Sequence, residues 1–215
     1  MKISIIKDFR RRLDKFFHPV IDTKNYWEQR YFKGGNSGAG SYGYLAEFKA
    51  EIINNFIKKK GIKRVIEFGC GDGNQLSLSK YPHYIGYDLS KTIIEMCKTK
   101  FKDDETKEFH LLDEYNGEVA ELTLSLDVIF HLLKKDLFIE HMNYLFNASI
   151  RYVIIYSNNE DRPKDRHMRC WEFSKWIDEN KEQWKLNKFI PNKFPYDKKT
   201  GKGSISDFYI YERLN

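Results

Sequence analysis

The sequence predicts an α/β fold built on a mostly parallel β-sheet, and two observations support this prediction. From residue 63 onward, short runs rich in β-branched and aromatic residues alternate with longer segments in which apolar residues have helical spacing. Such alternation is typical of parallel strands whose connecting helices cover both faces of one sheet. The C-terminal end differs, because two strand-like runs there are joined only by a turn rich in Pro, Lys and Gly.

The first 60 residues precede this alternating region. Residues 5–18 are expected to form a basic amphipathic helix whose apolar face docks on the domain, with a membrane or partner contact as the alternative. Residues 34–43 contain too much glycine for regular structure, so they form either a flexible linker or a loop that lies flat against another surface. A helix over 44–60 follows from the helical spacing of Leu45, Phe48, Ile52 and Phe56, and Gly61 ends it.

The remaining elements alternate along the chain. Strands are expected at 63–68, 83–87, 108–112, 122–127, 151–156, 185–190 and 205–214. Helices are expected at 73–79, 90–101, 135–149 and 171–181. Ser90 and Asp136 stand just before or at the start of two of these helices, where a short polar side chain can cap the backbone N–H groups. We therefore expect both to be N-caps.

The segment from Val65 to Asn74 is the most informative part of the chain. Its first four residues predict a buried strand, and the glycines at 69, 71 and 73 let the backbone turn sharply with no side chain between it and a ligand. Asp88 ends the next strand, where a carboxylate can accept hydrogen bonds from ribose hydroxyls. The segment therefore predicts a nucleoside-bearing cofactor at the carboxyl ends of adjacent strands.

The same segment argues against a phosphate-binding site. A dinucleotide motif needs Gly-x-Gly-x-x-Gly, and its third glycine is replaced here by Asn74. A P-loop needs Gly-Lys-Ser/Thr after its glycines, and none follows. What remains is an acidic residue two positions before the first of three alternate glycines.

That arrangement, Glu67 with Gly69, Gly71 and Gly73, resembles the first motif of the class I S-adenosylmethionine-dependent methyltransferases. The resemblance implies a Rossmann-like, doubly wound, seven-stranded and mostly parallel sheet that ends in a C-terminal antiparallel strand pair. It implies an N-terminal helical and lid extension at 1–43, a cofactor-binding methyltransferase domain at 44–215, and S-adenosyl-L-methionine (SAM) as the cofactor. The expected cofactor-binding residues are Arg30, Glu67, Gly69, Cys70, Gly71, Gly73, Asn74, Asp88, Leu89, Asp113 and Asp127.

Three of these residues have roles that only the resemblance supplies. Arg30, in the lid region, is expected to meet the carboxylate of the methionine part, and Asp113 to accept from the adenine amino group. An exposed turn aspartate is an equally good interpretation of Asp113. Asp127, after the fourth strand, is expected to lie under the methyl group.

The expected catalytic or acceptor-binding residues are His131, His167 and Arg169. A histidine can take a proton near neutrality, which a hydroxyl acceptor must lose as it attacks. The other interpretation of His131 is a histidine that holds a loop by hydrogen bonds. The basic segment 162–169 can grip an anionic acceptor through bidentate arginine contacts, or it is a solvated loop.

The leading functional hypothesis is methyl transfer to a hydroxyl or amine of a small polar acceptor, such as a sugar, a phosphorylated metabolite or a surface-glycan precursor. It follows a closer resemblance to small bacterial methyltransferases of surface-glycan and small-molecule modification, carried by the Tyr-Trp and glycine-rich segments at 26–43 and by His167-x-Arg169. RNA methylation is an alternative, although the Asp/Asn-Pro-Pro-Tyr/Phe motif of base-amine enzymes is missing after the fourth strand. A further alternative is that the protein binds the cofactor without catalysis, as the partner subunit of another protein.

Composition limits the other classes of protein. The 215 residues carry 37 Lys and Arg against 31 Asp and Glu, a net charge of +6 that suits an anionic partner without specifying one. The three cysteines are an odd number without metal-ligand spacing, so we expect no disulfide framework, no structural metal and a cytoplasmic location. Charges interrupt the apolar N-terminal residues, which argues against a membrane span.

Overall fold

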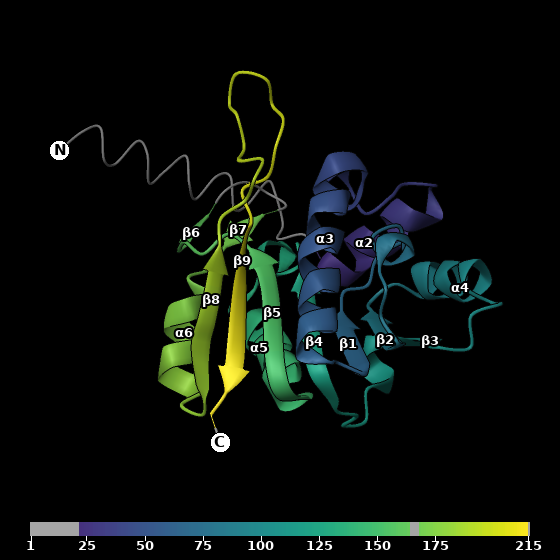
Figure 1. Ribbon diagram of the computed structural model, residues 1–215. Coiled ribbons are helices and arrows are strands. Elements are labelled where there is room, and N and C mark those ends of the chain that lie inside the picture. Colours follow the sequence, from purple (N-terminus) through teal and green to yellow (C-terminus); the bar gives the residue numbers. More distant parts are fainter. Residues whose placement is uncertain (1–21, 164–167, 215) are drawn as a thin grey trace.

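Seven strands form one twisted sheet with helices on both faces in the computed structural model, which describes residues 22–163 and 168–214 (Figure 1). The strands of this sheet are β1 (Arg64–Phe68), β2 (His83–Asp88), β3 (Lys107–Leu111), β4 (Ala120–Leu126), β5 (Ser149–Ser157), β8 (Trp184–Ile190) and β9 (Asp207–Arg213). The helices are α2 (Thr23–Phe32), α3 (Gly43–Lys60), α4 (Lys91–Lys100), α5 (Lys135–Asn147) and α6 (Phe173–Asn180). The expected helix at 5–18 and His167 lie outside the described residues.

The strand order is β3-β2-β1-β4-β5-β9-β8. Strands β1 to β5 are parallel, and β9 pairs antiparallel with both β5 and β8. This confirms the predicted seven-stranded, mostly parallel sheet with an antiparallel pair at its C-terminal end. A separate two-stranded hairpin, β6 (Arg162–Pro163) with β7 (Arg169–Cys170), follows β5.

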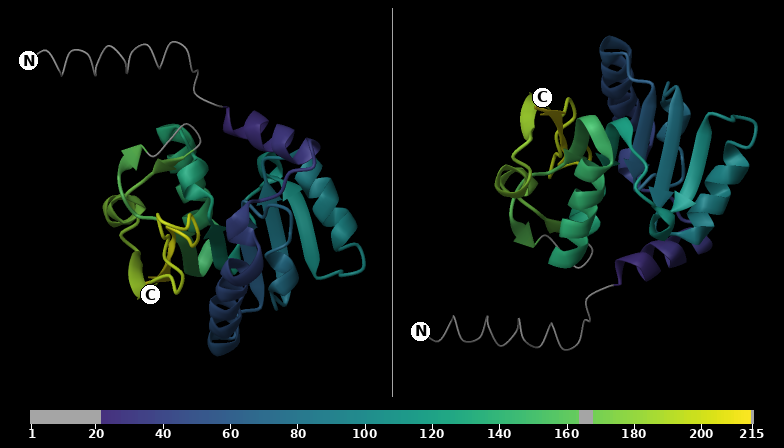
Figure 2. Two further views of the ribbon diagram at one scale, coloured as in Figure 1. Left: turned by 90° about the horizontal axis from the view of Figure 1, so that it is seen from above. Right: turned by 90° about the horizontal axis from the view of Figure 1, so that it is seen from below.

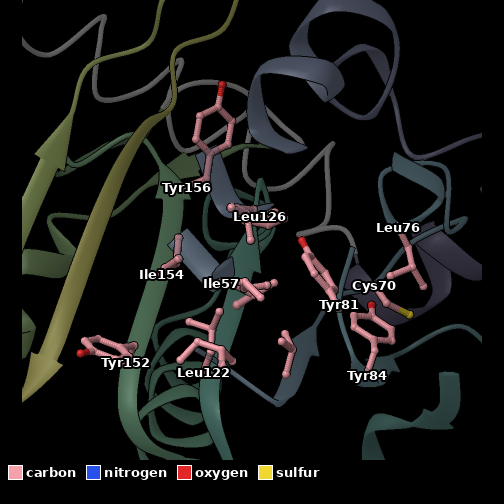
Figure 3. Close-up of a cluster of buried hydrophobic side chains, with 14 of the residues drawn as sticks. Ile57, Cys70, Leu76, Tyr81, Tyr84, Leu122, Leu126, Tyr152, Ile154 and Tyr156 are labelled. Carbon is pink, nitrogen blue, oxygen red and sulfur yellow. The ribbon is translucent and has the colours of Figure 1, made fainter. Parts of the chain in front are cut away.

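The helices divide into two layers because the central strands present apolar side chains to both faces. Helices α3 and α4 pack on one face and α5 and α6 on the other, and α2 packs against α4 near the carboxyl edge (Figure 2). Figure 3 shows the core under α3, where Ile57 faces Leu122 of β4 and Ile154 of β5. These three side chains are at most 4% exposed.

Two expected local features are wrong. Residues 73–79 do not form an α-helix: Gly73 has a φ of +66°, and only the 3₁₀ turn Leu76–Leu78 follows before the chain enters β2. The left-handed φ of Gly73 cannot belong to a right-handed helix, and Ser79 is already extended, with a φ of −96° and a ψ of 146°, so only a short turn fits between them. Asp136 is not an N-cap, because α5 begins one residue earlier, at Lys135, with Lys134 in the cap position. Asp136 instead lies in the first turn, where its charge favours the helix dipole.

Other local predictions are confirmed. The Ser90 hydroxyl accepts a hydrogen bond from the Ile93 N–H at 3.2 Å and so caps α4. Gly61 ends α3 with a left-handed φ of +65°. Helix α2 was not predicted, although Asp22 gave a signal for it: this residue caps the helix by accepting from the Lys24 N–H.

Within the described ranges, no helix has both the length and the apolar character that crossing a bilayer requires.

Candidate active site

A cavity of about 590 Å³ opens at the carboxyl ends of β1, β2 and β4. This volume is within the range of sites that hold drug-sized ligands. Its floor comes from the turns after these three strands, and the walls come from α2, the segment 37–41, α3, α5 and the β8–β9 hairpin. The predicted residues among its lining are Glu67, Gly69, Cys70, Gly71, Asp88, Leu89, Asp127 and His131.

The glycine turn after β1 leaves the cavity floor without side chains. Gly69 and Gly71 have φ values of +90° and +57°, a region that favours glycine. A Cβ on Gly69 would also collide with Val128, and one on Gly71 with the Ser37 hydroxyl. Gly73 has another role, because it lies outside the cavity lining and a Cβ there would stand 2.7 Å from the Phe101 ring. Its missing side chain lets the turn pack on the end of α4.

Asp88 ends β2 beside this turn. Its carboxylate accepts hydrogen bonds from the Gly71 N–H at 3.1 Å and the Ser90 N–H at 3.0 Å. Burial raises the pKa of Asp88, and these two N–H groups act in the opposite direction because they stabilise the charged form. The result is a fixed carboxylate at the edge of the cavity, in the position expected for a contact with ribose hydroxyls.

Glu67 lies at the end of β1 and is 4% exposed. Its Oε2 accepts a hydrogen bond from the Tyr84 hydroxyl at 2.7 Å. Burial raises the pKa of Glu67 to about 7, against the lowering effect of the Tyr84 bond and of the Lys49 charge. Ionised Glu67 is costly in this buried place, and a cationic ligand in the cavity would stabilise its ionised form.

Asp127 follows β4 and is, within the described residues, the only non-glycine residue with a positive φ, at +61°. Its Oδ2 accepts from the Lys49 Nζ at 2.8 Å and its Oδ1 from the Ser206 hydroxyl at 2.7 Å. The side chain is 18% exposed, whereas that of Lys49 is only 1% exposed. Two partners from distant parts of the chain therefore fix this carboxylate, and the left-handed backbone of Asp127 costs about 1–3 kcal/mol that the rest of the fold must offset.

Lys49 and Ser206 were missed by the sequence reasoning. Lys49 occupies the apolar face of α3, four residues after Leu45 and four before Ile53, both of which are buried. A lysine at a core position of an amphipathic helix is a signal that could have been used. Ser206 gave no such signal, because only the return of the β8–β9 hairpin brings it to the carboxyl end of β4.

The glycine-rich segment 34–43 is a fixed wall of the site. The Ser37 N–H and the Tyr42 hydroxyl both donate to Asp72 Oδ2 at 2.8 Å, and the Asp72 N–H donates to the Ser37 hydroxyl at 2.9 Å. Asn74 Nδ2 donates to the Ser41 carbonyl at 2.6 Å, and Asn74 does not line the cavity. The segment was expected to be either a flexible linker or a loop that lies flat against another surface, and these bonds show the second form.

Besides Gly73 and Asn74, two more expected cofactor-binding residues, Arg30 and Asp113, lie outside the cavity lining. Arg30 does not line the cavity: its Nε donates to the Asn36 carbonyl at 2.7 Å and its guanidinium lies 5.5 Å from the Trp27 ring centre. Asp113 has a side chain that is 66% exposed and an oxygen 3.5 Å from Lys24 Nζ, and its neighbour Leu112 lines the cavity instead.

Two of the expected acceptor-side residues, His131 and Arg169, lie in the described part of the chain, and of these only His131 lines the cavity. The Trp27 and His131 rings meet edge to face with centroids 5.0 Å apart, and the Thr23 hydroxyl donates to the His131 carbonyl at 3.3 Å. Arg169 lies outside the lining, with its guanidinium 4.0 Å from the Trp171 ring centre and a 3.1 Å bond to Asp161.

A second histidine in the cavity wall, His141 of α5, was not predicted. Its Nε2 is 2.8 Å from the Ser125 hydroxyl, and burial lowers its pKa to about 4. His141 is therefore neutral near pH 7, and we assign it to packing and hydrogen bonding.

Comparison with solved structures identifies the fold. The methyltransferase domain of bacterial CtHen1-C matches with a TM-score of 0.62 at 18% identity, over 79% of this chain and 98% of that chain. Magnesium protoporphyrin IX methyltransferase (ChlM) from Synechocystis PCC 6803, with bound SAM, matches with a TM-score of 0.64 at 14% identity, over 91% and 99%. The N-methyltransferase NodS from Bradyrhizobium japonicum WM9, in complex with S-adenosylhomocysteine (SAH), matches with a TM-score of 0.68 at 10% identity, over 91% and 100%.

No protein-family model and no curated protein match the sequence. The structural matches show that the chain has the class I SAM-dependent methyltransferase fold, which confirms the fold predicted from Glu67 and its glycines. The residues in the cavity fit SAM: glycines leave room at the floor, Asp88 is a fixed carboxylate, and Glu67 and Asp127 suit a ligand with cationic groups. Among the residues that the structure describes, no group of three or more His, Cys, Asp or Glu is arranged to hold a metal ion.

Proposed function

We propose that this protein is a SAM-dependent methyltransferase that acts on a hydroxyl or amine of a small polar acceptor, such as a sugar, a phosphorylated metabolite or a surface-glycan precursor. The observation that supports this most directly is the cavity, in which Asp88, Glu67 and Asp127 stand at the ends of three adjacent strands around a glycine turn. Bound SAM would supply an electrophilic methyl group on a sulfonium. The chain itself would orient the two reactants and exclude water.

His131 is the proposed proton acceptor for a hydroxyl substrate. It lines the cavity beside Trp27, and a neutral imidazole has the basicity to take a proton near pH 7. The basic segment 162–169 is the proposed contact for acceptors that carry phosphate or carboxylate.

Cys70, Cys97 and Cys170 are all buried free thiols, which suits a reducing compartment, and we propose the cytoplasm.

Two measurements test the proposal in sequence. Isothermal titration with SAH tests the cofactor, and no binding by the purified protein would refute it. An SAH-release assay then tests a panel of nucleotide sugars, phosphorylated amines and neutral oligosaccharides. Turnover with none of them, by a protein that binds SAH, would contradict the small-acceptor assignment and favour a non-catalytic partner subunit.

The role of His131 is tested on the best acceptor of the panel. His131→Ala is expected to reduce turnover on a hydroxyl acceptor by about 10²- to 10⁴-fold, the usual contribution of a general base. The SAH affinity should stay within about threefold, because the histidine is assigned to the acceptor side. His110→Ala is the matched control, since His110 lies on β3 outside the cavity lining. Equal turnover in both variants would rule out His131 as the base.

A further inference from the structure

The cavity contains one fixed cation among several acids. Four carboxyl side chains line it, those of Glu67, Asp88, Asp127 and Glu140. Among the lining residues that the structure describes, Lys49 is the only lysine or arginine. The amino-acid end of SAM carries both a carboxylate and an ammonium. Because an anion loses hydration in such a cavity, a cationic partner stabilises the carboxylate, and Lys49 is the one that the described lining offers.

Lys49 reaches the cavity lining from α3, and its side chain is 1% exposed. Its side chain runs from α3 to the end of β4, where Nζ lies 2.8 Å from Asp127 Oδ2 and 5.2 Å from the centre of the Tyr156 ring. An ammonium has three N–H donors and the bond to Asp127 uses one of them. The carboxylate of Asp127, which also accepts from Ser206, has further lone pairs and remains 18% exposed.

The sheet sets the separation between the two ends of the site. Asp88 ends β2 and Asp127 follows β4, and β1 lies between these strands. Two strand spacings correspond to about 10 Å. With a ribose at Asp88, an extended ligand that crosses the bare turn at Gly69 ends beside Lys49 and Asp127.

We propose that Lys49 and Asp127 together bind the amino-acid end of SAM, with Lys49 meeting its carboxylate and Asp127 its ammonium. Lys49 thus takes the role that the sequence suggested for Arg30, whose guanidinium is held by Asn36 and Trp27 outside the cavity. The inference rests on the cofactor of the proposed function and does not depend on the acceptor.

The test compares SAH with 5′-methylthioadenosine, which has the same adenosine and thioether but no amino-acid end. Dissociation constants for both are measured by isothermal titration with the full chain. Lys49→Met is expected to weaken SAH by about 10- to 100-fold, the effect of losing a charge-assisted hydrogen bond, and methylthioadenosine by less than about threefold. Lys58→Met, at an exposed position of the same helix, and Arg30→Met should leave both affinities within about twofold.

Because Lys49→Met leaves Asp127 without its cation, a double variant, Lys49→Met with Asp127→Asn, keeps the pair uncharged and is measured in parallel. It should lose the preference for SAH over methylthioadenosine while keeping the affinity for methylthioadenosine. Equal weakening of both ligands, or an unchanged ratio, would overturn the proposal, as would a selective loss of SAH in Arg30→Met. If neither ligand binds the wild-type protein, the cofactor assignment itself fails, which is a separate result.

Discussion

Glu67 should make the stability of the cofactor-free protein depend on pH. Burial raises the pKa of this carboxyl from 4.5 to about 7 in the folded chain. Among the described residues, the Tyr84 hydroxyl donates to this carboxyl, and it can bond equally to a glutamine oxygen. Glu67→Gln therefore removes the titration and keeps the shape and the hydrogen bond, so a difference between the two proteins reports the cost of ionising Glu67.

The magnitude follows from the pKa difference. Folded Glu67 holds its proton more tightly than the unfolded chain does, so its contribution to stability is greatest below pH 4.5 and is lost as the pH rises to 7 and above. A shift of about 2.5 pKa units corresponds to about 3.4 kcal/mol in total. Of this, about 2.5 kcal/mol should be lost between pH 5 and pH 8.

Urea unfolding at pH 5 and pH 8, without cofactor, measures this loss. The stability of Glu67→Gln relative to wild type should increase by about 2.5 kcal/mol between the two pH values. Glu51→Gln, at an exposed position of α3, should give no such change, and titrations common to all three proteins cancel. Parallel pH profiles for wild type and Glu67→Gln would refute the reasoning, because Glu67 would then be ionised at little cost.

Two further predictions concern the floor of the cavity. Gly69→Ala should lower the free energy of unfolding by about 1–3 kcal/mol more than Gly117→Ala does. Both glycines have φ near +90°, but only a Cβ at 69 meets another side chain, that of Val128. Equal losses in urea titrations would mean that backbone strain alone sets the cost. Asp88→Asn should weaken the affinity for SAH by about 10-fold or more in calorimetry, because it removes a charged acceptor at the cavity edge. Asp113→Asn, at an exposed position outside the lining, should leave this affinity unchanged. A loss at Asp113 comparable to that at Asp88 would return Asp113 to the cofactor site.

Much of the fold was readable because its signals are local. The parallel strands are buried on both faces, so they appear as short apolar runs such as Val65 to Phe68. Ser90 and Gly61 are also local signals, since a cap depends on the backbone of its own turn. The segment 73–79 was wrongly predicted as a helix: four of its seven residues are Gly, Asn or Ser, which favour a helix weakly, and Gly73 is left-handed while Ser79 is extended.

The floor of the candidate site could be predicted for the same reason, and its walls could not. Gly69, Gly71 and Asp88 are close in sequence and sit at ends of neighbouring strands, so a motif captures them. Arg30 and Asp113 were assigned by resemblance; in the structure Arg30 bonds to the Asn36 carbonyl, Asp113 is exposed beside Lys24, and neither lines the cavity. Side-chain direction at a wall depends on such local contacts.

The sequence by itself predicted the mostly parallel sheet, the glycine turn and the acidic residues at the ends of β1 and β2, because periodicity and short motifs are recorded in nearby residues. Only the tertiary structure decided that Lys49, from a helix 78 residues before Asp127, and Ser206, from a hairpin 79 residues after it, meet at the end of β4. Contacts of that range depend on how whole elements pack, and no periodicity or short motif records them.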